Sequence, residues 1–345
     1  MMKNIYLSIL ILTNLSAIGQ WIPINIPNSA SYRALRTKGD HIWAAGTKGT
    51  VAHSKNRGNT WEFFQLPQAE KLDFRDLAIL SEQEIMLMSA GLSQEGKAIL
   101  YYTKDEGKSW TIKVNLTEPG YFFDCLTWNP QNQNGWLLAD PINQRLTLFA
   151  VSKDTARLIS PINSPKLQQN EAFFAASGSS MIQLGNLIHF IGGGADTIKV
   201  YQYNIKRNSW TTVPLNSKAG EAKGYFSIGA KNNRVIWAAG GDYRKLNESS
   251  IPIITSQDGG KHWSPMKNSP NFYIEKVIWA KPFWIVSGPS QSAAYHEKKN
   301  VWKSLGESHY HNIIQVGDMI WGIGAKGQLG YISLSSIDQL FLTEK

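Results

Sequence analysis

Short apolar runs that end in a small or acidic residue recur along the whole chain. Each run has the length of one buried β-strand, and successive runs begin 36 to 52 residues apart. That period is typical of one four-stranded blade of a β-propeller, which can bury its apolar faces only against neighbouring blades. Seven runs predict seven blades: HIWAAG (41–46), EIMLMSAG (84–91), GWLLAD (135–140), LIHFIGGG (187–194), RVIWAAGG (234–241), FWIVSG (283–288) and MIWGIG (319–324).

A polar octet closed by Trp is the second repeat. Its Ser or Thr at the first position and Asp at the third, replaced by Asn56 in the first copy, can bond the backbone of a turn, and its Gly at the fifth can take a positive φ. The closing Trp offers a large ring to bury at the start of the next strand. The octet therefore predicts a hairpin at the outside of a blade rather than a ligand site. Its three copies are SKNRGNTW (54–61), TKDEGKSW (103–110) and SQDGGKHW (256–263).

The last blade lacks a Trp after its third strand, QLGYISL (328–334), whereas the apolar strand WIPINI (21–26) has no blade of its own. We predict that this N-terminal strand completes the last blade, because such closure removes two open sheet edges. The predicted fold is all-β. It is a single seven-bladed β-propeller domain over residues 20–345, with little helix.

Residues 1–19 have the pattern of a cleaved secretory signal. Lys3 precedes an apolar stretch over residues 5–15, and small residues follow before Gln20. The apolar stretch is too short to span a bilayer. We therefore expect a secreted or periplasmic protein without a membrane span, cleaved near Gly19–Gln20. The lone Cys125 excludes an intramolecular disulfide.

Composition narrows the function classes. The chain has 345 residues, 42% of them hydrophobic, and a formal net charge of +9 from scattered Lys and Arg. The chain has no basic run with interleaved aromatic residues, so no nucleic-acid partner is expected. No metal-ligand spacing is present. The segment GIGAKG (322–327) matches G-x-G-x-x-G but precedes a predicted strand instead of a helix, so no dinucleotide cofactor is expected either. We expect a monomer.

The candidate site residues lie just before or just after the Gly-ending strands, at corresponding positions in different blades. On a propeller these positions surround the central channel, on the face opposite the octet hairpins. Two interpretations stay open: a ligand clamp, or an internal lattice of ion pairs that ties blades together. The predicted binding set is Arg33, Arg75, Asp73, Asp76, Asp124, Asp140, Glu171, Asp242 and Tyr243.

Two functions are compatible with this set. The first is non-catalytic binding of a protein or glycan at the channel mouth. The second is a glycoside hydrolase or lyase, which requires two carboxyl groups about 5 to 10 Å apart facing one cleft. The catalytic candidates for the second function are Asp73, Asp76, Glu171, Asp242 and Tyr243.

Several motifs, in order and with octets between them, carry a resemblance to a known family. They are SYRAL (31–35), DFRDL (73–77), FFDCL (122–126), ADPIN (139–143), EAFFAASG (171–178), GYFSI (224–228) and GGDYRK (240–245). With the octets, which resemble Asp-boxes, they resemble exported bacterial BNR-repeat propellers related to the Ycf48-type photosystem II assembly factors. The group often carries the label oxidoreductase, which no residue here supports.

The resemblance implies a propeller that binds a membrane-protein intermediate partly through an arginine patch, which Arg33 and Arg75 would match. The wider Asp-box superfamily includes sialidases. This chain lacks their F/Y-R-I-P segment and their three arginines at matching inner-strand positions.

Overall fold

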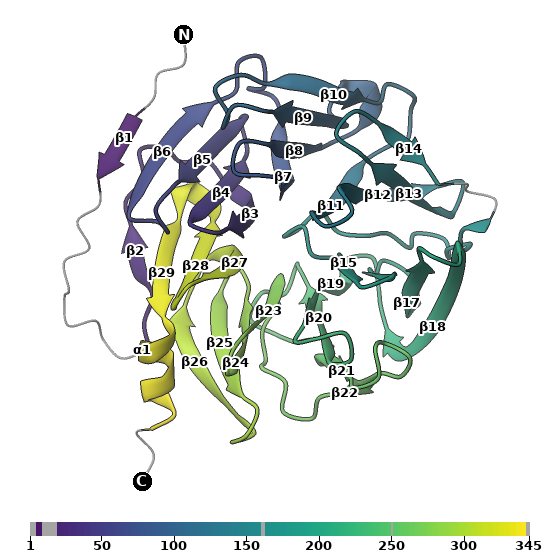
Figure 1. Cartoon of the computed structure of the whole chain (residues 1–345). Coiled ribbons are helices and arrows are strands. Elements are labelled where there is room, and N and C mark those ends of the chain that lie inside the picture. Colours follow the sequence, from purple (N-terminus) through teal and green to yellow (C-terminus); the bar gives the residue numbers. More distant parts are fainter. Residues whose placement is uncertain (1–4, 9–18, 160–162, 250, 343–345) are drawn as a thin grey trace.

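Seven antiparallel sheets stand in a ring around a central axis (Figure 1). The computed structural model describes residues 5–8, 19–159, 163–249 and 251–342, with only the backbone of residues 5–8. Each sheet is one blade. Within a blade the strands follow one another outward from the axis in chain order, except that the first two strands of the chain lie at the outer edges of the first and last blades. The predicted seven-bladed β-propeller of four-stranded blades is confirmed.

The first four blades contain, from the axis outward, β3 (Tyr32–Lys38), β4 (His41–Gly46), β5 (Thr50–Ser54) and β6 (Thr60–Gln65); β7 (Asp73–Ile79), β8 (Ile85–Ala90), β9 (Ile99–Thr103) and β10 (Thr111–Asn115); β11 (Phe123–Asn129), β12 (Asn134–Ile142), β13 (Arg145–Val151) and β14 (Ala156–Leu158); and β15 (Met181–Leu184), β16 (Leu187–Ile191), β17 (Thr197–Asn204) and β18 (Ser209–Lys218). The last three contain β19 (Lys223–Ala230), β20 (Ile236–Asp242), β21 (Ile254–Ser256) and β22 (Ser264–Pro265); β23 (Lys276–Ala280), β24 (Phe283–Ser287), β25 (Gln291–His296) and β26 (Val301–Glu307); and β27 (Tyr310–Val316), β28 (Met319–Gly324), β29 (Leu329–Ser333) and β2 (Ile22–Ile24).

The seven apolar runs form the second strand of every blade. Every residue of β8 and of β24 is buried, because a blade packs against a neighbour on each face. The core lies between blades: Trp43 of the first blade, for example, shares one apolar cluster with Phe74 and Leu87 of the second.

The octets form the turns between third and fourth strands, as predicted. In the second copy the Thr103 hydroxyl accepts the Gly107 N–H at 3.0 Å, and Asp105 Oδ1 accepts the Ser109 N–H at 2.9 Å. Gly107 has a φ of +81°, and the Trp110 indole donates to its carbonyl at 3.0 Å. The other two copies repeat the contact between the first hydroxyl and the glycine N–H, at 2.8 Å each.

The N-terminal strand closes the ring. β2 pairs antiparallel with β29, and the Trp21 indole beside it donates to Ser292 Oγ at 2.8 Å. The predicted closure of the last blade is confirmed. A further strand, β1 (Ile5–Ser8), pairs with β6 at the outer edge of the first blade.

The rest of the predicted secretory signal over residues 1–19 lies outside the described residues, apart from Gly19. One short α-helix, α1 (Leu334–Leu340), follows β29 and buries Ile337. No helix within the described ranges has the length and apolar character needed to cross a membrane.

Candidate binding site at the channel mouth

The innermost strands of five blades carry a β-bulge near their first residue. A bulge leaves one residue unpaired and changes the direction of its side chain. In the sixth blade Glu275 has an equivalent place, because its N–H bonds the carbonyl of Ser287, the residue that also pairs with Lys276. The residues at the five bulges are Arg33, Arg75, Asp124, Phe226 and His311.

Five of these six residues line one cavity of about 390 Å³ at the mouth of the channel. The exception is Asp124. The cavity is therefore formed by inner strands from five different blades, together with the loop after β20 and a segment of the fourth blade. Its lining residues are Arg33, Arg75, Phe174, Ala175, Ala176, Phe226, Tyr243, Leu246, Tyr273, Glu275, Pro289 and His311.

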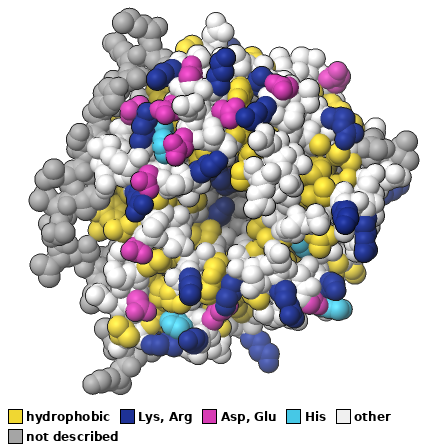
Figure 2. Space-filling view, in the orientation of Figure 1, with side chains coloured by type: hydrophobic (Ala, Val, Ile, Leu, Met, Phe, Trp, Pro, Cys, Tyr) yellow, Lys and Arg dark blue, Asp and Glu magenta, His cyan; other side chains and the backbone are white. Residues whose placement is uncertain are grey.

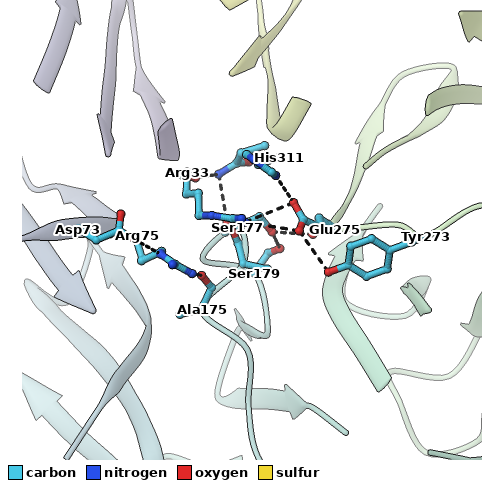
Figure 3. A network of polar contacts seen from close by, with 11 residues as sticks. Arg33, Asp73, Arg75, Ala175, Ser177, Ser179, Tyr273, Glu275 and His311 are labelled. Atoms are coloured by element: carbon cyan, nitrogen blue, oxygen red, sulfur yellow. Dashed lines mark hydrogen bonds and ion pairs between the residues drawn. The ribbon is translucent and has the colours of Figure 1, made fainter. Parts of the chain in front are cut away.

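The segment 174–180, here called the plug, runs from the fourth blade into the channel (Figure 3). Four consecutive carbonyls of the plug accept hydrogen bonds from side chains of other blades. The pairs are Arg75 to Ala175 O at 3.0 Å, Arg33 to Ala176 O at 3.2 Å, Asn312 to Ser177 O at 3.0 Å and Arg36 to Gly178 O at 2.6 Å. The small residues of this segment allow it to fit among the inner strands, and Ser177 and Ser180 are fully buried.

Glu275 is the centre of the polar network drawn in Figure 3. Its carboxylate lies 2.5 Å from His311 Nδ1, 3.4 Å from Arg33 Nη1, and accepts from the Tyr273 hydroxyl at 3.2 Å. Burial tends to raise the pKa of this carboxyl. Arg33 and His311 more than offset that effect, so the pKa lies below its usual value. Glu275 is a buried anion with several partners.

The two cavity arginines each have a carboxylate partner as well as a plug carbonyl. Arg33 pairs with Glu275, and Arg75 Nε donates to Asp73 Oδ2 at 2.6 Å. Their side chains are 20% and 30% exposed. The lattice and the clamp are therefore not exclusive: the arginines tie blades to the plug while part of each guanidinium faces the cavity.

Asp76 lies deeper, where it is fully buried. One oxygen pairs with Arg36 at 2.7 Å, and the backbone N–H groups of Leu77 and Leu126 each donate to the carboxylate at 2.8 Å. Burial raises the pKa of this carboxyl although Arg36 opposes the shift. Lys276 lies in the same charged cluster, and its pKa is lowered to about 7, first by burial and then by Arg36.

Asp124 and Asp140 form a second pair of acids. They lie on adjacent strands at the bulge, where Phe123 pairs with Ala139 and the Asp140 N–H bonds the Phe122 carbonyl. Burial and the charge of Asp140 raise the pKa of Asp124, and burial raises the pKa of Asp140 to about 6. Asp124 Oδ2 is buried without a hydrogen-bond partner.

The other predicted site residues are dispersed. Glu171 accepts from the Tyr201 hydroxyl at 2.6 Å within the fourth blade and does not line the cavity. Asp242 accepts the Arg244 N–H at 2.9 Å. Tyr243 does line the cavity and is 47% exposed.

Aromatic rings form one wall of the cavity. Phe174 stacks on Phe226 with ring centroids 4.0 Å apart, and Tyr273 and Tyr243 approach Phe226 edge-on at 5.0 and 6.3 Å. Such arrangements are the favoured geometries of aromatic pairs. The predicted combination of arginines and aromatic walls occurs here, but with Glu275 as the acid beside them.

Sequence reasoning missed Glu275, Arg36, Asn312 and the plug's place in the channel. The sequence does carry a signal for Glu275: it precedes FWIVSG in the sixth blade at the position that Arg33 and Arg75 occupy in theirs. Asn312 directly follows His311 and carried no signal of its own.

Figures 1 and 3 view the channel from opposite sides. Successive blades run clockwise in Figure 1 and counterclockwise in Figure 3, so the views show opposite faces. The face in Figure 2 is hollowed at its centre, where Lys and Arg side chains are visible.

Metal binding has no candidate cluster in the described part of the chain. Among the residues that the structure describes, no group of three or more His, Cys, Asp and Glu is placed to hold a metal ion.

No family model and no curated protein matches the chain. Solved structures do. Ycf48 from Cyanidioschyzon merolae is 12% identical with a TM-score of 0.67, and Ycf48 bound to a D1 peptide is 12% identical with a TM-score of 0.64; each match covers 92% of this chain and 99% of the other. The computationally designed Ika8 protein is 10% identical with a TM-score of 0.57, over 89% and 98% of the two chains. These similarities show that the fold is a known β-propeller fold over almost the whole chain.

Proposed function

We propose that this protein is an exported, non-catalytic propeller scaffold that binds a segment of a partner protein in the cavity at the channel mouth. The main support for this proposal is that residues at or next to the inner strands of five blades line one cavity beside the plug. Arg33, Arg75 and Tyr243 are the proposed contacts from the predicted set. Asp73 positions Arg75, and Asp76 supports the plug through Arg36.

The similarity to Ycf48 supports a protein partner through the shared architecture, since one of those structures has a D1 peptide bound. The pattern of residues 1–19 supports export. The octets support the assignment to Asp-box propellers, because in each copy the first hydroxyl and the third side chain, Asn56, Asp105 or Asp258, accept N–H groups of the turn backbone.

The cavity does not favour the alternative of a glycoside hydrolase or lyase. Of the described residues that line it, Glu275 is the one carboxylate, and it is already paired with Arg33 and His311. Of the catalytic candidates, Tyr243 lines it, whereas Asp73, Asp76, Glu171 and Asp242 do not. The described lining residues of this cavity therefore do not include the two carboxyl groups that such chemistry requires.

The test is a double variant, Arg33→Ala with Arg75→Ala, in the mature protein. We expect loss of the partner retained by the unsubstituted protein, measured by cross-linking in cell-envelope extracts followed by mass spectrometry. The control is Arg57→Ala with Arg234→Ala, two exposed arginines elsewhere on the ring. Circular dichroism checks that both variants are folded.

Retention of the same partner by the folded double variant would refute this site. A glycan-array signal that the double variant loses, with no protein retained by the unsubstituted chain, would replace the protein partner with a glycan.

A further inference from the structure

The charges of the cavity are compensated before any ligand arrives. Arg33 pairs with Glu275, Arg75 pairs with Asp73, and both arginines donate to plug carbonyls. An incoming carboxylate would have to compete with a buried or half-buried carboxylate that already holds its position. The cavity therefore lacks the uncompensated positive charge that acid recognition requires.

The rim of the cavity, in contrast, has exposed hydrophobic side chains. Of the five large hydrophobic side chains that are exposed within the described part of the chain, two, Tyr243 and Leu246, line this cavity, at 47% and 38% exposure. Both belong to the loop after β20. Exposed apolar side chains that gather at a concave site are typical of a docking surface.

The wall behind that rim is aromatic. One face of Phe226 is covered by Phe174, while Tyr243 and Tyr273 meet it edge-on at 85° and 86°. Another ring that enters the cavity can pack edge-on or offset against the exposed Tyr243 and the half-buried Phe174, with the buried Phe226 and Tyr273 behind them, and can lie near an arginine guanidinium. The volume of about 390 Å³ leaves room for one large side chain and part of its backbone.

The plug also illustrates how the arginines bind a peptide. Arg75 and Arg33 donate through Nη1 to two consecutive main-chain carbonyls, Ala175 O and Ala176 O. A guanidinium has five N–H donors, so further donors are available to a second chain. Main-chain carbonyls suit these donors, since they need no charge of their own.

We propose that the cavity binds an aromatic side chain of the partner segment, packed between Tyr243, Leu246 and the Phe226 wall, while Arg33 and Arg75 donate to carbonyls of the same segment. This inference rests on the proposed function, because it takes the partner to be a protein. The recognised element is thus a neutral aromatic residue in an extended peptide rather than an acidic one.

The experiment selects a phage-displayed library of random nonapeptides on the mature protein and then measures the selected peptides by fluorescence anisotropy. We expect enrichment of Trp, Phe or Tyr. Replacing that residue by Ala should weaken binding at least tenfold, and replacing it by Leu at least threefold. Asp→Asn or Glu→Gln changes in the peptide, and a rise from 50 to 500 mM salt, should each change the dissociation constant less than threefold.

Variants of the rim provide matched controls. Tyr243→Ala and Leu246→Ala should each weaken peptide binding at least fivefold, whereas Ile112→Ala and Leu92→Ala should not change it. The two controls are large hydrophobic residues with similar exposure, 51% and 39%, and they do not line the cavity. Because all four side chains are exposed, each variant is expected to fold.

The outcomes separate the inference from the function on which it rests. Peptides enriched in Asp or Glu, with salt-sensitive binding that depends on Arg33 and Arg75, would overturn the inference and leave the proposed function standing. Aliphatic enrichment without aromatic preference would also overturn it. If no peptide is selected, or if selected peptides bind equally well to all four rim and control variants, both fail at this cavity.

Discussion

Gly178 links the plug to the buried charges below it at the scale of a single residue. Its φ is +59°, in the left-handed region that favours glycine, and a Cβ built there would lie 2.3 Å from the carboxyl carbon of Asp76. Asp76 cannot move away easily, because Arg36 and two backbone N–H groups hold it. Glycine is therefore the residue that fits at position 178 of the plug.

We expect Gly178→Ala to lower the free energy of unfolding by about 3 kcal/mol, about 1 kcal/mol from the backbone conformation and the rest from overpacking. Gly39→Ala is the matched control, since Gly39 has the same φ of +59° with no atom within 4 Å of the added Cβ. It should cost about 1 kcal/mol. Urea denaturation measures both, and equal losses would show that Asp76 does not constrain the plug.

The Asp124–Asp140 pair gives a prediction for pH. Both carboxyls have raised pKa values in the folded protein, that of Asp140 to about 6, against about 3.9 in an unfolded chain. A raised pKa contributes stability that is present below about pH 4 and is lost as the pH rises through the folded-state value. The ionised pair thus destabilises the protein at neutral and alkaline pH.

Asp124→Asn should remove that cost. We expect the free energy of unfolding to increase by about 1–2 kcal/mol at pH 8, with no increase at pH 4. Denaturant titrations between pH 4 and 8 measure the change. Asp196→Asn, on an exposed turn, should leave the pH profile unchanged. Parallel profiles for the unsubstituted protein and Asp124→Asn would contradict the coupling.

At the scale of elements, the sequence predicted what is periodic and missed what is not. The Gly-ending strands and the octets are local patterns set by burial and turn chemistry, so the blades and their hairpins could be located from residues a few positions apart. The contact between Arg33 and Ala176 spans 143 positions, and that between Asn312 and Ser177 spans 135. No local pattern encodes such pairs.

The site residues divide in the same way. Arg33, Arg75 and Tyr243 were predicted from their phase in the repeat, and they line one cavity. Asp76 has the same kind of phase but pairs with Arg36 below the plug, because the residue after a bulge does not share the direction of the bulged one. The place of a residue within the blade repeat predicts which blade carries it and that it lies near the channel. It does not predict how deep in the channel its side chain lies.

The whole molecule is joined at its last blade, where β2 from one end of the chain pairs with β29 near the other. Only three residues of β2 make this pairing, with the Trp21 indole bonded to Ser292. If export removes residues 1–19, the mature chain begins directly before the closing strand. The predicted cleavage would therefore remove β1 and keep the closure of the ring.

Two truncations test this organisation. A chain that begins at Gln20 should unfold in one guanidinium transition with nearly the midpoint of the full chain. Of the described contacts it loses the β1 edge strand on the first blade and the bond from the Gly19 N–H to Ser336 Oγ, and it keeps β2. A chain that begins at Pro27 loses Trp21 and β2, so the edge of β29 is left open. We expect a drop of about 3 kcal/mol or more in its free energy of unfolding, in the range of removing a large packed aromatic side chain. Hydrogen exchange should show faster exchange at β29 in this chain, whereas equal stability of the two truncations would mean that β2 is not needed to close the ring.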